Sequence, residues 1–170
     1  MLKEILVIDD NPDIRSLVSN ILKDQNFEVR TAANYDQAVF EINKKLPDLA
    51  IIDIKLDKTD KDGIDLLKLV TKKSKLVPII MISGHATVAI AVEATRLGAY
   101  EFIEKPFSKE KILNYVKRAL ESSELKKEKD IIEKLSSSES RVLISGPTGT
   151  GKELVAEKFI KIQWELKNLL

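Results

Sequence analysis

Five short apolar runs alternate with amphipathic stretches through the first 120 residues of the chain. The runs have the length and composition of buried strands: Ile5 to Ile8, Glu28 to Ala32, Leu49 to Ile52, Val77 to Ile82 and Tyr100 to Ile103. Between them, apolar residues recur three or four positions apart, the spacing of one helix face. Strands that are buried on both faces and separated by helices form a parallel sheet with helices on both sides. The pattern therefore predicts a doubly wound α/β fold with a five-stranded parallel sheet.

The composition excludes several classes of site. The 170-residue chain has no cysteine and one histidine, which excludes disulfides, thiolate metal sites and histidine-rich metal clusters. Its 28 basic and 27 acidic side chains leave a formal charge of +1, which argues against nucleic-acid binding through bulk positive charge. Because no apolar run approaches the roughly 18 residues of a membrane span and acids interrupt the N-terminus, we expect a cytoplasmic protein without membrane contact.

A long helix is predicted after the fifth apolar run. Ser108 is a suitable N-cap, and no Gly or Pro follows until the serine-rich stretch 136–140. Ile112, Val116 and Leu120 are spaced to pack on the sheet, whereas the segment that follows is strongly charged. We expect residues 121–140 to be a helical linker, which is either a dimer stalk or simply the exposed end of a helix.

Chemically useful side chains gather at the ends of the apolar runs, where doubly wound sheets bind their ligands. Asp9 and Asp10 follow the first run, and Asp53 follows the third. Three converging carboxylates repel by roughly 4 kcal/mol per pair at about 4 Å and an effective dielectric constant of about 20. Lys105, after the fifth run, supplies one balancing charge, and Mg2+ would supply two more. Ser83, which closes the fourth run, can hydrogen-bond a phosphorylated carboxylate.

Each of these residues also has an ordinary structural interpretation. The first acidic pair suits a turn or a helix start, with Asp10 or Asn11 as the N-cap. Lys105 and Ser83 suit a turn and a loop opening. Their joint location at the carboxyl ends of the predicted strands favours a site in which a carboxylate beside Mg2+ and a lysine attacks phosphorus.

Four segments, ILVIDDNPDIR, LAIIDIKL, IIMISGHA and GAYEFIEKPF, resemble the receiver domain of bacterial two-component response regulators over residues 1–120. The resemblance implies a CheY-like, flavodoxin-like fold. It also implies that Asp53 accepts a phosphoryl group from a sensor histidine kinase. Asp9, Asp10, Asp53 and the main-chain carbonyl of Lys55 would then hold Mg2+.

The same resemblance implies roles for the residues around the acceptor. Ser83 would contact the phosphoryl group, Lys105 would pair with it, and the Lys105-Pro106 bond would be cis. Phe102 would turn inward on activation, or it is simply a core aromatic. His85 would tune the lifetime of the phosphate, or it is simply an exposed loop residue. The face formed by the fourth helix, fifth strand and fifth helix would carry the signal and support a homodimer or mixed dimer.

A second motif follows the linker. The segment SGPTGTGKE fits a phosphate-binding loop, with a strand predicted before it at 141–145 and a helix after it. Its candidate phosphate-binding residues are Gly146, Gly149, Gly151 and Lys152. Glu153 stands where such loops usually carry the Ser or Thr that binds Mg2+. Over roughly residues 130–160 the sequence resembles sigma-54-dependent AAA+ activators, and the receiver motifs resemble the NtrX branch of NtrC-type regulators.

The resemblance leads to three hypotheses about function. The first is a phospho-accepting response regulator, in nitrogen-type regulation, that is not itself an enzyme. Under this first hypothesis, residues 141–170 are a truncated AAA+ remnant without ATPase activity. The same hypothesis expects no direct DNA binding by this chain. The second is a nucleotide-binding fragment that acts through Lys152. The third is an interaction module without its own output, which dimerises with a full-length regulator or binds its kinase.

Overall fold

The computed structural model describes residues 2–56, 62–84, 87–136 and 151–167. The chain divides into two units, Met1–Ser123 and Glu124–Leu170. The first unit is an α/β domain. The second contains the distal part of one helix and all of another.

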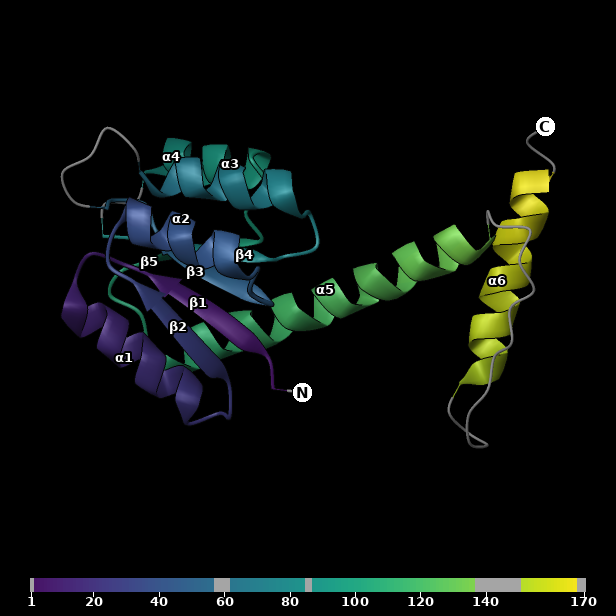
Figure 1. The fold of residues 1–170 in the computed structure, drawn as a ribbon, viewed down its shortest axis with the longest axis horizontal. Helices are drawn as coiled ribbons and strands as arrows, with labels where there is room; N and C mark the ends of the chain where they lie inside the picture. Colours follow the sequence, from purple (N-terminus) through teal and green to yellow (C-terminus); the bar gives the residue numbers. More distant parts are fainter. Residues whose placement is uncertain (1, 57–61, 85–86, 137–150, 168–170) are drawn as a thin grey trace. The chain divides into compact units, whose positions relative to one another are not determined.

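Five parallel strands form the sheet of the first unit, in the order β2-β1-β3-β4-β5 (Figure 1). They are β1 (Glu4–Ile8), β2 (Glu28–Ala32), β3 (Leu49–Asp53), β4 (Ile79–Ser83) and β5 (Glu101–Glu104). This order confirms the predicted doubly wound α/β fold. β4 begins at Ile79 rather than at the predicted Val77, because Pro78 has no N–H to donate to the ladder. The Pro78 carbonyl still accepts a hydrogen bond from the Ala50 N–H, at 3.1 Å.

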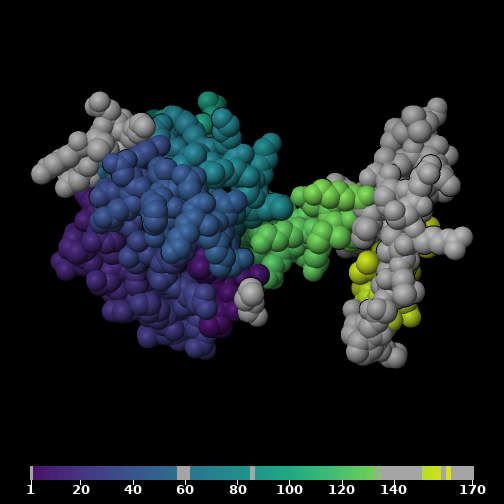
Figure 2. All heavy atoms as spheres, in the orientation of Figure 1, coloured from purple at the N-terminus to yellow at the C-terminus, as the bar shows by residue number. Residues whose placement is uncertain are grey.

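Helices cover both faces of this sheet (Figure 1). One face carries α1 (Pro12–Lys23) and the start of α5 (Lys109–Ser136), and the other carries α2 (Tyr35–Lys44), α3 (Gly63–Lys73) and α4 (Val88–Arg96). Successive strand residues therefore enter different cores. Ile5 and Val7 pack with α1 and α5. Leu6 and Ile8 pack with the helices of the opposite face. Side chains fill the space between the ribbons of this unit (Figure 2).

The helix starts are set by polar caps. The side chain of Asn11 accepts hydrogen bonds from the N–H groups of Asp13, at 2.9 Å, and Ile14, at 3.4 Å. Asn11 is thus the cap of α1, and the carboxylate of Asp10 is left for other contacts. The hydroxyl of Ser108 accepts from the N–H of Lys111 at 3.2 Å, as predicted for the start of α5.

α5 continues to Ser136, as the absence of Gly and Pro predicts. Its first half is buried at Ile112, Val116 and Leu120, and the hydroxyl of Ser123 donates to the carbonyl of Leu76 at 2.6 Å. The second unit contains the rest of α5 and α6 (Lys152–Lys167). The predicted strand at 141–145 lies outside the described residues. None of the described helices has the length and apolar character that a membrane span requires.

Arg30 on β2 joins several elements near the start of β1. Its Nε and Nη2 donate to the Glu4 carboxylate at 2.9 and 2.7 Å, and Nη1 donates to the Glu41 carboxylate at 2.6 Å. The remaining N–H groups donate to the carbonyls of Glu41 and Lys45 at the end of α2, at 2.8 and 2.7 Å. All the donors of the guanidinium are therefore used. Glu4 is only 8% exposed, so its charge depends on these partners.

We expect Arg30→Met to lower the free energy of unfolding by about 3 kcal/mol, because the buried Glu4 carboxylate would lose its main partner. Urea denaturation of the full chain measures this loss. Arg118→Met, at an exposed position of α5, is the matched control and should change stability by less than about 0.5 kcal/mol. A loss no larger in Arg30→Met than in the control would contradict the prediction.

The pH dependence of stability should reflect the same cluster. Burial disfavours the charged form of Glu4, but hydrogen bonds from Lys45 and Arg30 outweigh it and hold the pKa below the ordinary value of 4.5. The stabilising contribution of ionised Glu4 is therefore complete above that ordinary value and is lost as the pH falls through the lowered pKa. In Glu4→Gln, the unfolding free energy should fall less steeply between about pH 5 and about pH 3 than in the wild type. Equal slopes would show that Glu4 is not responsible.

Candidate functional site

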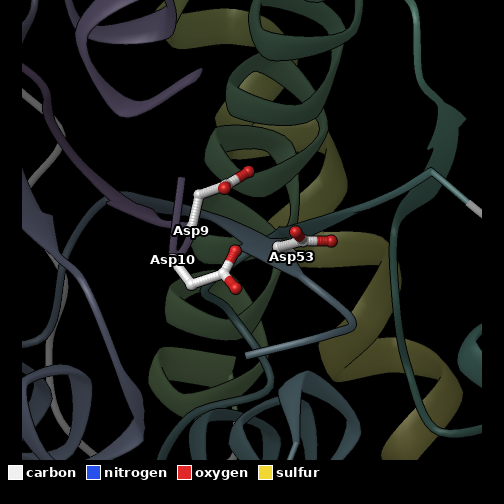
Figure 3. A group of neighbouring side chains, drawn as sticks. All are labelled: Asp9, Asp10 and Asp53. Carbon is white, nitrogen blue, oxygen red and sulfur yellow. The ribbon is translucent and has the colours of Figure 1, made fainter. Parts of the chain in front are cut away.

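Three carboxylates meet at the carboxyl ends of β1 and β3 (Figure 3). Asp9 directly follows β1, and Asp53 is the last residue of β3. The two strands are neighbours, with Ile8 opposite Ile52, so the following residues lie side by side. Asp9, Asp10 and Asp53 each offer an oxygen that lies within 4.8 Å of the other two. Asp9 is fully buried, Asp53 is 5% exposed and Asp10 is half-buried.

Lys105 joins two of these acids. It follows β5, and its Nζ lies 2.7 Å from Oδ2 of Asp9 and 2.7 Å from Oδ2 of Asp53. Its backbone N–H donates to the carbonyl of Ser83 at 2.8 Å, which holds the ends of β4 and β5 together. The Lys105-Pro106 peptide bond is cis, as the resemblance implied. The lysine thus reaches past the end of β4 to the acids of β3 and β1.

Burial and charge shift the titration of this pair. Burial raises the pKa of Asp53, and the charges of Asp9 and Asp10 add to the rise, while Lys105 opposes it. Burial disfavours the ammonium of Lys105, but hydrogen bonds to Asp53 and Asp9 outweigh burial and raise the pKa of Lys105. Lys105 therefore stays positively charged beside the Asp53 carboxyl, whose pKa lies above the ordinary value.

The carboxylates differ in how their oxygens are used. Oδ2 of Asp9 accepts from Lys105, and Oδ1 accepts from the N–H of Asn11 at 2.9 Å. The Asp10 carboxylate accepts no hydrogen bond from the residues that the structure describes. Asp10 and Asp53 therefore offer the more available oxygens of the group. Carboxylate oxygens of this kind suit a hard divalent cation.

The other residues singled out in the sequence lie at different distances from this group. Ser83, the last residue of β4, is 2% exposed and ends the strand beside β3, whose Asp53 lies opposite Ile82. Lys55 follows two residues after Asp53, with an exposed side chain. Phe102 lies on β5, half-buried against the core of the α2, α3 and α4 face.

Gly63 is a site residue that sequence reasoning missed. A Cβ at this position would lie 2.0 Å from the carbonyl oxygen of Asp53, closer than any side chain allows. The Gly63 N–H donates to the carbonyl of Ile54 at 2.8 Å, so the start of α3 sits directly against the end of β3. The signal in the sequence was the Asp62-Gly63 pair, in which Asp62 caps α3 and Gly63 permits the close approach.

The second motif is only partly described. Gly146 and Gly149 lie outside the described residues, as does His85 of the receiver segment. Gly151 has a φ of 75°, and Lys152 is the first residue of α6. The helix predicted after the loop is therefore present, in the second unit.

Comparison with protein families gives two matches. Residues 5–117 match the response regulator receiver domain. Residues 119–168 match the sigma-54 interaction domain, a longer stretch than the 130–160 expected from the sequence.

Regulators of the NtrX type are similar over nearly the whole chain. An NtrX-like protein of Rickettsia bellii is 37% identical, over 98% of this chain and 40% of its own length. The nitrogen assimilation regulatory protein NtrX of Azorhizobium caulinodans is also 37% identical, over 92% of this chain and 39% of its length. The chain thus spans about 40% of the length of the curated relatives it matches.

Solved structures agree with these matches. A crystal structure of Brucella abortus NtrX is similar, at 40% identity and a TM-score of 0.70, covering 95% of this chain and 41% of that one. Its isolated receiver domain is similar at 46% identity and a TM-score of 0.66, covering 69% and 98%. The beryllofluoride-activated NtrC4 receiver domain dimer has 34% identity and a TM-score of 0.67, covering 72% and 99%. With its receiver fold and these matches, the chain belongs to the response regulators, and part of a sigma-54 interaction domain follows its receiver domain.

Proposed function

We propose that this chain receives the signal of a two-component system by accepting a phosphoryl group on Asp53. The donor is a phosphohistidine on a sensor histidine kinase, and the reaction depends on Mg2+. The observation that carries the proposal is the bridge of Lys105 between Asp9 and Asp53, beside the half-buried Asp10. Within this proposal, residues 1–120 are the receiver, 121–140 a linker and 141–170 the AAA+ portion.

Asp10 and Asp53 would hold Mg2+, with Asp9 close behind and the main-chain carbonyl of Lys55 as a further ligand. The fit rests on the three carboxylate oxygens within 4.8 Å of one another. When bound, the metal supplies positive charge that neutralises the phosphoryl oxygens and orients the group for transfer.

The protein's own side chains would do the rest of the chemistry. An ionised oxygen of Asp53 attacks phosphorus, the bond from phosphorus to the histidine nitrogen breaks, and an acyl phosphate forms on Asp53. The Lys105 ammonium, 2.7 Å from the Asp53 carboxylate, pairs with the negative charge of the transferred group. The hydroxyl of Ser83, at the end of the adjacent strand, hydrogen-bonds a phosphoryl oxygen.

The α4-β5-α5 face would transmit the signal to partners. Phosphorylation would repack Phe102 in this face and favour a homodimer or a mixed dimer. Phe102 borders a groove of about 480 Å³ between α4 and β5. Val88 and Val92 of α4 line the same groove and are 83% and 46% exposed. The similar NtrC4 receiver domain is described as a dimer in its beryllofluoride-activated form.

Nucleotide binding through Lys152 stays a prediction.

Incubation with acetyl phosphate and Mg2+ should add one phosphate to the wild-type chain, as read by intact-mass spectrometry. Asp53→Asn should remove this labelling, because the amide oxygen is a far weaker nucleophile than a carboxylate. Asp36→Asn, at an exposed position of α2, is the matched control and should label normally. Labelling that persists in Asp53→Asn, or that survives removal of Mg2+ with EDTA, would refute the proposal.

Val92→Lys should prevent dimer formation by the phosphorylated chain without changing its labelling. A charge placed in the apolar face should weaken association at least tenfold, or by about 1.4 kcal/mol. Leu17→Lys is the matched control, because Leu17 is 49% exposed on α1, on the other face of the sheet. Sedimentation velocity compares the variants with and without acetyl phosphate. Dimers that persist in Val92→Lys, or that are lost equally in the control, would rule out this face.

A further inference from the structure

Arg15 contacts the backbone of the acidic loop, which is formed by Asp9 and Asp10. It is the fourth residue of α1, and its side chain turns back over the start of its own helix. One nitrogen, Nη1, donates to the carbonyl of Asp9 at 2.6 Å and to the carbonyl of Asp10 at 2.9 Å. The guanidinium therefore binds the backbone of the two acids and leaves their carboxylates to point elsewhere.

This orientation is unfavourable for a cation in an ordinary helix. The N-terminal end of a helix carries a partial positive charge, so acids are favoured there and cations are not. The first turn of α1 follows this rule at Asp13, and Arg15 breaks it. What offsets the cost is the pair of carbonyls and the nearby group of three carboxylates.

The loop needs such an anchor. The last ladder bond of β1 on its β2 side runs from the Asp9 N–H to the carbonyl of Ala32, at 3.2 Å. Beyond it, the peptide units of Asp9 and Asp10 have left the sheet, while their carboxylates repel each other and Asp53. Arg15 holds both carbonyls at this point.

We propose that Arg15 is the positioning residue of the acidic site, which keeps the Asp9 and Asp10 carboxylates directed towards Asp53 in a geometry that binds Mg2+. This inference rests on the proposed function, in which these acids form the metal site. In this role, Arg15 acts through the backbone carbonyls of Asp9 and Asp10 and is not itself a ligand of the metal.

The positioning role and a purely electrostatic role predict opposite effects on metal binding. A positive charge close to a cation site repels the metal, so removing the charge alone would tighten Mg2+ binding. Removing a group that orients the ligands weakens metal binding, typically by 10- to 100-fold. The sign of the change therefore distinguishes the two roles.

The test is calorimetric titration of the full chain with MgCl2. Arg15→Met should raise the Kd for Mg2+ about tenfold. Arg118→Met, which removes the same charge from an exposed position of α5, should leave the Kd unchanged. Arg15→Lys keeps the charge on a side chain one bond shorter and should give an intermediate Kd. A Kd that falls or stays the same in Arg15→Met would overturn the proposal.

A measurement without metal separates this proposal from the proposed function. The Asn11 N–H donates to Oδ1 of Asp9 at 2.9 Å, so its hydrogen exchange reports how firmly the loop is held. In metal-free protein, this exchange should be at least tenfold faster in Arg15→Met and moderately faster in Arg15→Lys. The Gly63 N–H, bonded to the Ile54 carbonyl, is the internal reference and should not change. Unchanged Asn11 exchange overturns the role of Arg15, whereas wild-type protein that binds no Mg2+ overturns the proposed function and, with it, the link from the Arg15 contacts to metal binding.

Discussion

The ammonium of Lys105 lies between the carboxylates of Asp9 and Asp53, and the arrangement of the whole sheet edge depends on it. Three acids cannot share one edge without a compensating charge, because each close pair repels by several kcal/mol at the dielectric constant of a protein surface. A doubly wound parallel sheet brings the carboxyl ends of β1, β3 and β5 to the same side. The fold thus brings the three acids together and also places Lys105 beside them, where its positive charge offsets their mutual repulsion.

Several neighbouring residues hold Asp9, Asp10 and Asp53 in place, each through a different contact. Arg15 binds the backbone of the acidic loop, and Asn11 binds one oxygen of Asp9. Gly63 lets α3 lie against the carbonyl of Asp53, where any Cβ would overlap. The result is a site in which Asp9 is committed to structural bonds, while Asp10 and Asp53 keep oxygens for a ligand.

The site is also connected to the surface of α4. The Lys105 N–H binds the Ser83 carbonyl, so the strand ends that carry these two residues are held together. Phe102 lies on β5, three residues before Lys105, which follows the strand, and it borders the groove beside α4. Phe102 at the groove therefore lies only three residues from Lys105 at the acidic site. The cluster around Arg30 holds the opposite end of β1 and gives that end a separate, pH-sensitive source of stability.

The sequence alone determined the strand and helix order and the acids and lysine at the strand ends, because hydrophobic periodicity and position after a strand are local properties. Family resemblance added the cis Lys105-Pro106 bond. Only the tertiary structure decided that Asn11 rather than Asp10 caps α1, and that Arg15 binds the carbonyls of both acids. It also decided the approach of Gly63 to Asp53. The approach of Gly63 depends on how α3 packs against β3, whereas the contacts of Asn11 and Arg15 span two to six residues and depend on the path of the chain from β1 into α1.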